Sequence, residues 1–158
     1  MTRWSPWRAL RHTDVELWFA PLGGLRGLWE RRGDHDQITL DSSLDRQSRR
    51  EVLAHELVHA ERGIGWPVAT AATMQLEEER VWRIAMERLV PSDELHRFIE
   101  RQSTVGPVTL DDVADEFDLS PDGARRVAAR IAREPGWDQP ACSVVDPEAV
   151  NAEGDPDG

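Results

Sequence analysis

The sequence His55-Glu56-Leu57-Val58-His59 constrains the fold and chemistry of this chain more than any other feature. It lies in a stretch without Gly or Pro that ends at Gly63, which is typical of a helix. Residues four apart lie one above the other on a helix, so His55 and His59 can both reach one metal ion. Glu56 lies one step around the helix and can reach a water molecule on that metal. This HExxH motif therefore predicts a zinc site with a general base beside it, as in metallopeptidases.

Three short apolar segments precede the motif and predict strands, at residues 15–19, 27–30 and 37–40. Turn-rich stretches separate them, and residues 41–45 offer several N-cap candidates for the motif helix. On that helix Leu53 and Leu57 share one face, and both histidines lie on nearly the opposite face. We therefore expect an α+β fold. In this expected fold, a small antiparallel three-stranded sheet packs on the motif helix and on the helix that follows.

The second helix is expected from about residue 70 to residue 90, ahead of Pro91. Glu78 lies at the centre of its apolar stripe, which consists of Ala71, Met74, Val81, Trp82, Ala85 and Leu89. A buried carboxylate is costly unless something pairs with it, and a metal ion held by the two histidines would do so. Glu78 is therefore the predicted third ligand, whereas Glu77 and Glu79 are expected to be solvated. The alternative is that Glu78 belongs to a charged surface run.

Two histidines and a glutamate form an established zinc ligand set that leaves one position for water. With Glu56 as general base, the set predicts amide hydrolysis without a covalent enzyme intermediate. A metzincin is excluded, because residue 65 is Gly where that pattern has a third histidine. The chain has no tyrosine to stabilise an oxyanion. The candidates left open for that role are His12, His35, His96 and the arginines.

Beyond Pro91 the sequence predicts a helical subdomain over residues 92–136. Within it, the spacing of apolar residues over 109–131 is typical of a helix-turn-helix with a tight turn at residues 118–120. The expected domains are a metallopeptidase core at 1–91, this subdomain, and an acidic disordered tail at 137–158 that is rich in Pro, Gly and acids. A single Cys142 excludes an internal disulfide, and no stretch approaches a membrane span. These features favour a cytoplasmic protein.

The charge of the chain argues against direct nucleic-acid binding. The formal net charge is -11, and acidic surfaces are repelled by phosphates. The helix-turn-helix-like segment carries seven acids between residues 109 and 134 against four arginines, Arg125, Arg126, Arg130 and Arg133. A DNA-binding regulator is nevertheless one alternative, and a zinc-binding partner module without turnover is another. The intact Glu56 argues against the latter.

Several of these segments resemble the ImmA/IrrE family of zinc metallopeptidases. Residues 38–40 followed by 49–59 resemble the strand and active-site helix of that family. Residues 78–91 are similar to its second signature, a glutamate followed by A-x-x-F-A and ending in L-M-P. The resemblance covers roughly residues 36–133. Apolar exchanges, including Val58 for the usual glycine and Val90 for methionine, keep the helix faces intact.

The resemblance implies a regulatory protease of bacterial, phage or mobile-element origin. Such a protease cleaves a helix-turn-helix repressor and so releases the genes that the repressor controls. The repressor as protein partner is implied by the family alone, whereas the peptidase chemistry also follows from the motif.

Overall fold

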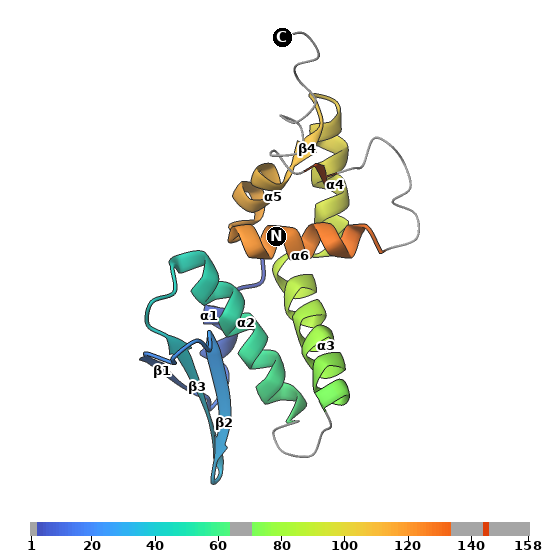
Figure 1. Cartoon of the computed structure of the whole chain (residues 1–158). Coiled ribbons are helices and arrows are strands. Elements are labelled where there is room, and N and C mark those ends of the chain that lie inside the picture. Colours follow the sequence, from blue (N-terminus) through green and yellow to red (C-terminus); the bar gives the residue numbers. More distant parts are fainter. Residues whose placement is uncertain (1–2, 64–70, 134–143, 146–158) are drawn as a thin grey trace, which may run out of the picture. The chain divides into compact units, whose positions relative to one another are not determined.

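The computed structural model describes residues 3–63, 71–133 and 144–145. The chain divides into two compact units, Met1–Leu89 and Val90–Gly158 (Figure 1). The first unit combines a sheet with helices, and the second is mostly helical over its described residues. The chain is thus α+β, as predicted. Within the described residues, no helix combines the length and the apolar character that crossing a membrane requires.

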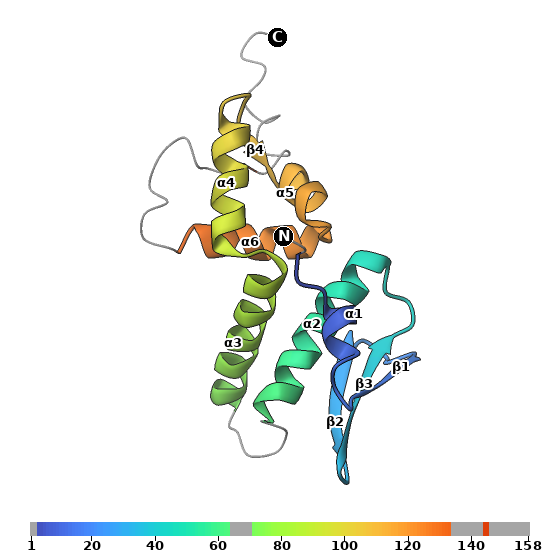
Figure 2. The same ribbon diagram turned by 180° about the vertical axis from the view of Figure 1, so that it is seen from behind.

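The described residues of the first unit form three helices and three strands. In chain order these are α1 (Pro6–Leu10), β1 (Glu16–Ala20), β2 (Gly27–Arg32), β3 (His35–Asp41), α2 (Arg46–Arg62) and α3 (Ala71–Leu89). Figures 1 and 2 show α2 lying between the sheet and α3. The strands and the two long helices were predicted close to their observed bounds. The short helix α1, which has Pro6 in its first turn, was not predicted.

The strand order corrects the sequence-based expectation of an antiparallel sheet. The order is β1-β3-β2, with β2 antiparallel and β1 parallel to β3. The sheet is therefore mixed, and β3 lies at its centre. Parallel neighbours need a connection of about a dozen residues or more. Residues 21–34, which include β2, provide that length because the chain crosses the end of β3 before it returns as β2.

Asp41, the last residue of β3, holds this crossing in place. Its carboxylate accepts a hydrogen bond from the backbone N–H of Leu22 at 2.7 Å. It also accepts from the backbone N–H of Ser43 at 2.9 Å and from the Ser43 hydroxyl. Gly23 and Gly24, with φ of 61° and 111°, provide backbone conformations that other residues rarely adopt. One side chain thus fixes both the loop into β2 and the loop into α2.

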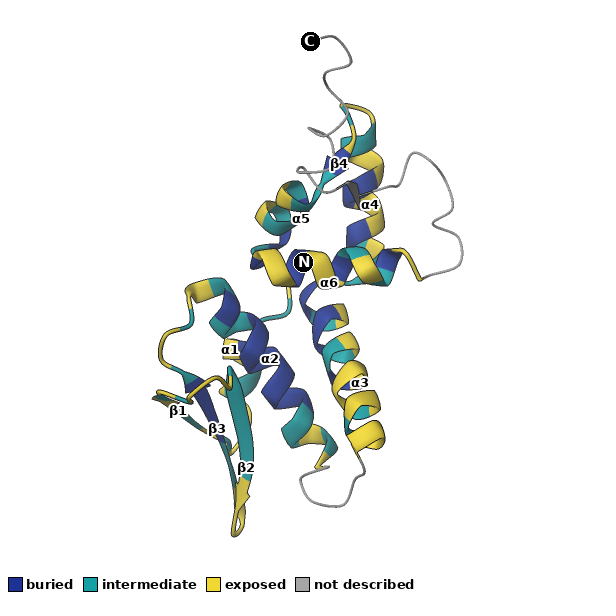
Figure 3. Cartoon of the chain, in the orientation of Figure 1, coloured by how far each residue is buried: buried dark blue, intermediate teal, exposed yellow. Residues whose placement is uncertain are grey.

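Helix α2 is buried on two sides, which explains why it carries so few exposed residues (Figure 3). The Asp45 side chain caps its N-terminus by accepting from Ser48 N–H at 2.7 Å, and Gly63 follows its last turn. Toward the sheet, it contributes to a core cluster composed of Ile38, Leu40, Val52, Leu53 and Leu57. The opposite face, which bears the histidines, packs against α3.

The second unit contains α4 (Ser92–Ser103), β4 (Val108–Thr109), α5 (Leu110–Phe117), α6 (Pro121–Ile131) and β5 (Val144–Val145). Thr109 and Asp112 form a capping box at the start of α5. The predicted tight turn at residues 118–120 joins α5 to α6, where Asp118 adopts a left-handed φ of 54°. Val144–Val145, predicted as part of a disordered tail, instead pairs with β4. The other residues of that tail lie outside the described part of the chain.

Replacing Asp41 with alanine tests whether this carboxylate fixes the crossing. Loss of its hydrogen bonds should lower the thermal unfolding midpoint by roughly 2–5 °C. The matched control is Asp34→Ala, because the Asp34 side chain is fully exposed at the turn between β2 and β3. Differential scanning fluorimetry of both variants gives the comparison. Equal midpoints for the two variants would show that Asp41 does not fix the crossing.

Candidate metal centre

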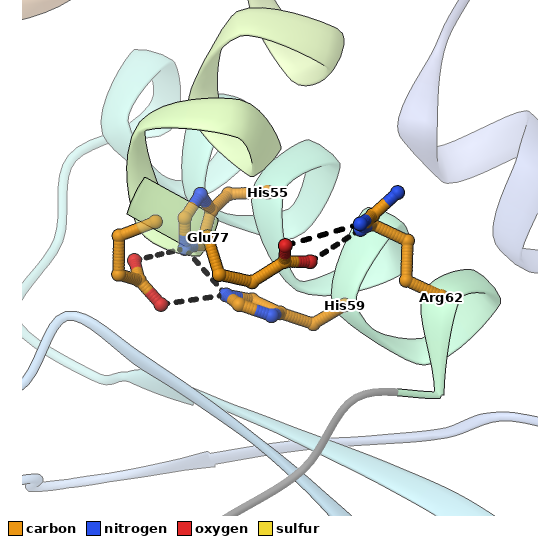
Figure 4. A network of polar contacts seen from close by, with 5 residues as sticks. His55, His59, Arg62 and Glu77 are labelled. Atoms are coloured by element: carbon orange, nitrogen blue, oxygen red, sulfur yellow. Dashed lines mark hydrogen bonds and ion pairs between the residues drawn. The ribbon is translucent and has the colours of Figure 1, made fainter. Parts of the chain in front are cut away.

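His55, His59 and Glu78 converge on one point of the first unit. The Nε2 atoms of the two histidines lie 3.1 Å apart. His55 Nε2 is 3.2 Å from Glu78 Oε2, and His59 Nε2 is 3.0 Å from Glu78 Oε1. Figure 4 shows the two imidazoles turned toward each other. The structure therefore brings together the three residues that the sequence predicted as metal ligands.

The donor atoms of this trio fit a divalent metal. One ligand atom from each residue lies within 4.8 Å of the others. Two imidazole nitrogens and one carboxylate oxygen suit zinc, and three protein ligands are the number found in catalytic zinc sites. The trio is the metal-ligand group detected among the described residues, and it does not include His12, His35 or His96.

The environment of Glu78 differs from the sequence-based expectation. Its side chain is 51% exposed, because the N-terminal half of α3 is largely open to solvent (Figure 3). The carboxylate is therefore not buried in an apolar stripe, although it does face the histidines. Hydrogen bonds from His55 and then from His59 hold the pKa of Glu78 well below its usual value. The carboxylate is thus ionised at neutral pH, as a metal ligand must be.

Packing fixes the orientation of the His55 imidazole. His55 is buried, and its ring lies against the Trp82 ring with the centroids 4.3 Å apart. His59 is only partly buried. Burial alone would lower the pKa of His59, but the carboxylates of Glu78, Glu56 and Glu77 outweigh it and raise that pKa. The site is thus electronegative and attracts cations.

Glu77 is not solvated, which corrects the sequence-based expectation. Arg62, the last residue of α2, forms a bidentate ion pair with Glu77, in which Arg62 Nη2 lies 3.0 Å from Glu77 Oε2 (Figure 4). The Glu77 side chain is only 17% exposed. This pair ties the end of α2 to α3, one residue before Glu78. Arg62 lies three residues after His59 and so on the same helix face, a signal that could have identified it from sequence.

Glu56 lies on the side of α2 that faces the sheet, next to β2. It is 6% exposed, and the backbone N–H of Trp29 on β2 donates to its carboxylate. Burial raises the pKa of Glu56 to about 7. A carboxyl group with this pKa exchanges its proton readily at neutral pH, which is the property that a general base and acid requires.

Two histidines and a glutamate around one point, with a buried carboxyl group beside them, make up a centre of the metallopeptidase type. Consistent with this class, the model of a peptidase family described as the IrrE N-terminal-like domain matches residues 19–126. The chain belongs to this family. The match begins in β1 and ends in α6, so it includes the entire HExxH motif and Glu78. A search of curated proteins finds no match to the chain.

Removing the Glu78 carboxylate tests its role as a ligand. Glu78→Ala should weaken zinc binding by more than the roughly 10–100-fold that loss of an outer-shell partner costs. Glu79→Ala, an exposed neighbour on the same helix, should bind zinc like the wild type. Glu77→Ala should fall between them, because it breaks the ion pair with Arg62. Isothermal titration calorimetry on chelator-treated protein measures all three, and equal losses would remove Glu78 from the site.

The raised pKa of Glu56 predicts a stability cost in the metal-free protein. Its pKa is 4.5 in the unfolded chain and about 7 in the folded state, so the folded protein holds the extra proton between these values. Stability should therefore fall as pH rises through this window. Glu56→Gln should abolish this fall and be more stable by roughly 1–3 kcal/mol at about pH 8. Urea unfolding across pH measures the difference, and parallel curves for both proteins would contradict the assignment.

Proposed function

We propose that this chain is a zinc-dependent endopeptidase that acts in the cytoplasm and cleaves a helix-turn-helix transcriptional repressor. Cleavage would release the genes of a phage or mobile element that the repressor controls. The observation that carries the peptidase part is the convergence of His55, His59 and Glu78 beside the buried Glu56. Membership of a peptidase family supports the same reaction class. The repressor substrate rests on the resemblance of the signatures to ImmA/IrrE proteases.

His55, His59 and Glu78 would hold the zinc ion, which makes the site a gluzincin centre. When bound, zinc supplies Lewis acidity, which polarises the scissile carbonyl and lowers the pKa of a water ligand. The protein supplies rigidity to this arrangement. Trp82 supports the His55 ring, and the Arg62–Glu77 ion pair holds α3 near the end of α2. Ligands that are held in place before binding lose less freedom when the metal enters.

Glu56 would move the proton. Its carboxylate takes a proton from the attacking water and later delivers that proton to the leaving amine. Peptide hydrolysis then proceeds without a covalent bond between enzyme and substrate. In the metal-free protein, burial raises the pKa of Glu56 to about 7, so neither form of the group is strongly disfavoured at neutral pH.

The contacts of the second unit disfavour the DNA-binding alternative. Arg125 of α6 pairs with Asp122 at 3.0 Å, and Arg130 donates to the backbone oxygen of Val90 at 2.9 Å. Arg125 and Arg130, two of the arginines that could contact phosphates, therefore already have partners within the unit. We assign this unit a substrate-docking or structural role.

Glu56→Gln tests the proposed reaction. The variant should keep zinc bound with near wild-type affinity and lose cleavage by roughly 100- to 10,000-fold, because the amide cannot accept the proton. The test substrate is a helix-turn-helix repressor taken from the genes that neighbour this one, incubated with purified enzyme and followed by gel electrophoresis. The control is Glu79→Gln, which should cleave normally. Cleavage by the Glu56→Gln variant at the wild-type rate would refute the mechanism.

A further inference from the structure

Gly27 lies where β2 meets the motif helix. It is the first residue of β2 and pairs with Leu40 of the central strand. Side chains at this register position point toward α2, as Leu40 does in the core cluster. Gly27 has no side chain to place there, so the backbone of β2 can approach the helix closely.

The space in front of Gly27 is filled by the side chains of α2. A Cβ atom added to Gly27 would lie 2.6 Å from Glu56 Oε1 and 2.9 Å from Glu56 Cγ. It would also lie 2.5 Å from Val52 Cγ1. All three distances are shorter than contacts that real Cβ atoms make. The Glu56 carboxyl group thus occupies the volume that any other residue at position 27 would need.

The same strand also contacts Glu56 through its backbone. Trp29, two residues further along β2, donates its backbone N–H to the Glu56 carboxylate. Backbone N–H groups of residues two apart on a strand point to the same side of that strand, so the segment from Gly27 to Trp29 approaches Glu56 as one unit. One residue of β2 gives the carboxylate room, and the other gives it a hydrogen bond.

We propose that Gly27 is a positioning residue that, together with the backbone of Trp29, forms a seat on β2 for the carboxyl group of Glu56. The seat limits this group to the side of α2 that faces β2. A methyl group at position 27 would push the carboxylate off the seat and away from the Trp29 N–H. The role of Glu56 as a base rests on the proposed function, whereas the seat itself is a matter of packing and can be tested without turnover.

A double-mutant cycle tests the seat in the full-length, metal-free protein. Because Gly27→Ala also meets Val52, all members of the cycle carry Val52→Ala, which removes that competing contact. In this background Gly27→Ala should lower the unfolding midpoint by roughly 3–10 °C when Glu56 is present. The loss should shrink by at least half when Glu56→Ala is added, because the crowded carboxyl group is then absent. Gly106→Ala is the matched control, since a Cβ there meets nothing within 4 Å.

Cleavage of the neighbouring repressor provides a second readout. Gly27→Ala with Val52→Ala should reduce kcat by roughly 100-fold relative to Val52→Ala alone, with KM and zinc affinity unchanged within about threefold. Equal midpoint losses with and without Glu56, or an unchanged kcat, would overturn the seat. If the wild type cleaves nothing, the proposed function fails, but the unfolding cycle still decides whether Gly27 seats Glu56.

Discussion

The burial of polar groups on helix α2 is the constraint on which the rest of the first unit depends. The helix passes between the sheet and α3, yet it carries His55, Glu56 and His59 in its C-terminal half. Buried polar groups are costly unless they find partners. Glu78 on α3 contacts both imidazoles through its carboxylate. The backbone N–H of Trp29 on β2 donates a hydrogen bond to the Glu56 carboxylate. The neighbours of α2 are thus arranged around its polar residues, and this arrangement forms the site.

The sheet contributes to the site through its topology. Because β3 takes the central position, β2 becomes an edge strand next to the motif helix. The crossing loop that permits this order is held by Asp41 at the end of β3. A meander of three antiparallel strands would have placed a different strand in the centre. The edge position of β2 brings Gly27 and Trp29 to Glu56, so strand order and site geometry are linked.

Much of this architecture follows from the sequence. Helical spacing placed both histidines on one face, and the position of Glu78 on the next helix indicated the third member of the trio. Which strands lie next to each other was not predictable. The alternation of apolar and polar residues gives the direction of side chains but not the order of strands in the sheet. Helical spacing places Arg62 on the face of the histidines, but it does not show that its side chain reaches Glu77 on the next helix. The exposure of Glu78 does not follow from the apolar stripe, because a stripe does not show how far along α3 another element covers it, and the first half of α3 is open to solvent.

The central claim is that His55, His59 and Glu78 bind one zinc ion. Anomalous diffraction at the zinc edge, from crystals of the full chain grown with zinc, tests it most directly. We expect one strong peak about 2.0–2.2 Å from an imidazole nitrogen of each histidine and from a carboxylate oxygen of Glu78. A peak that lies away from these three side chains, or none in crystals that diffract well, would contradict the account.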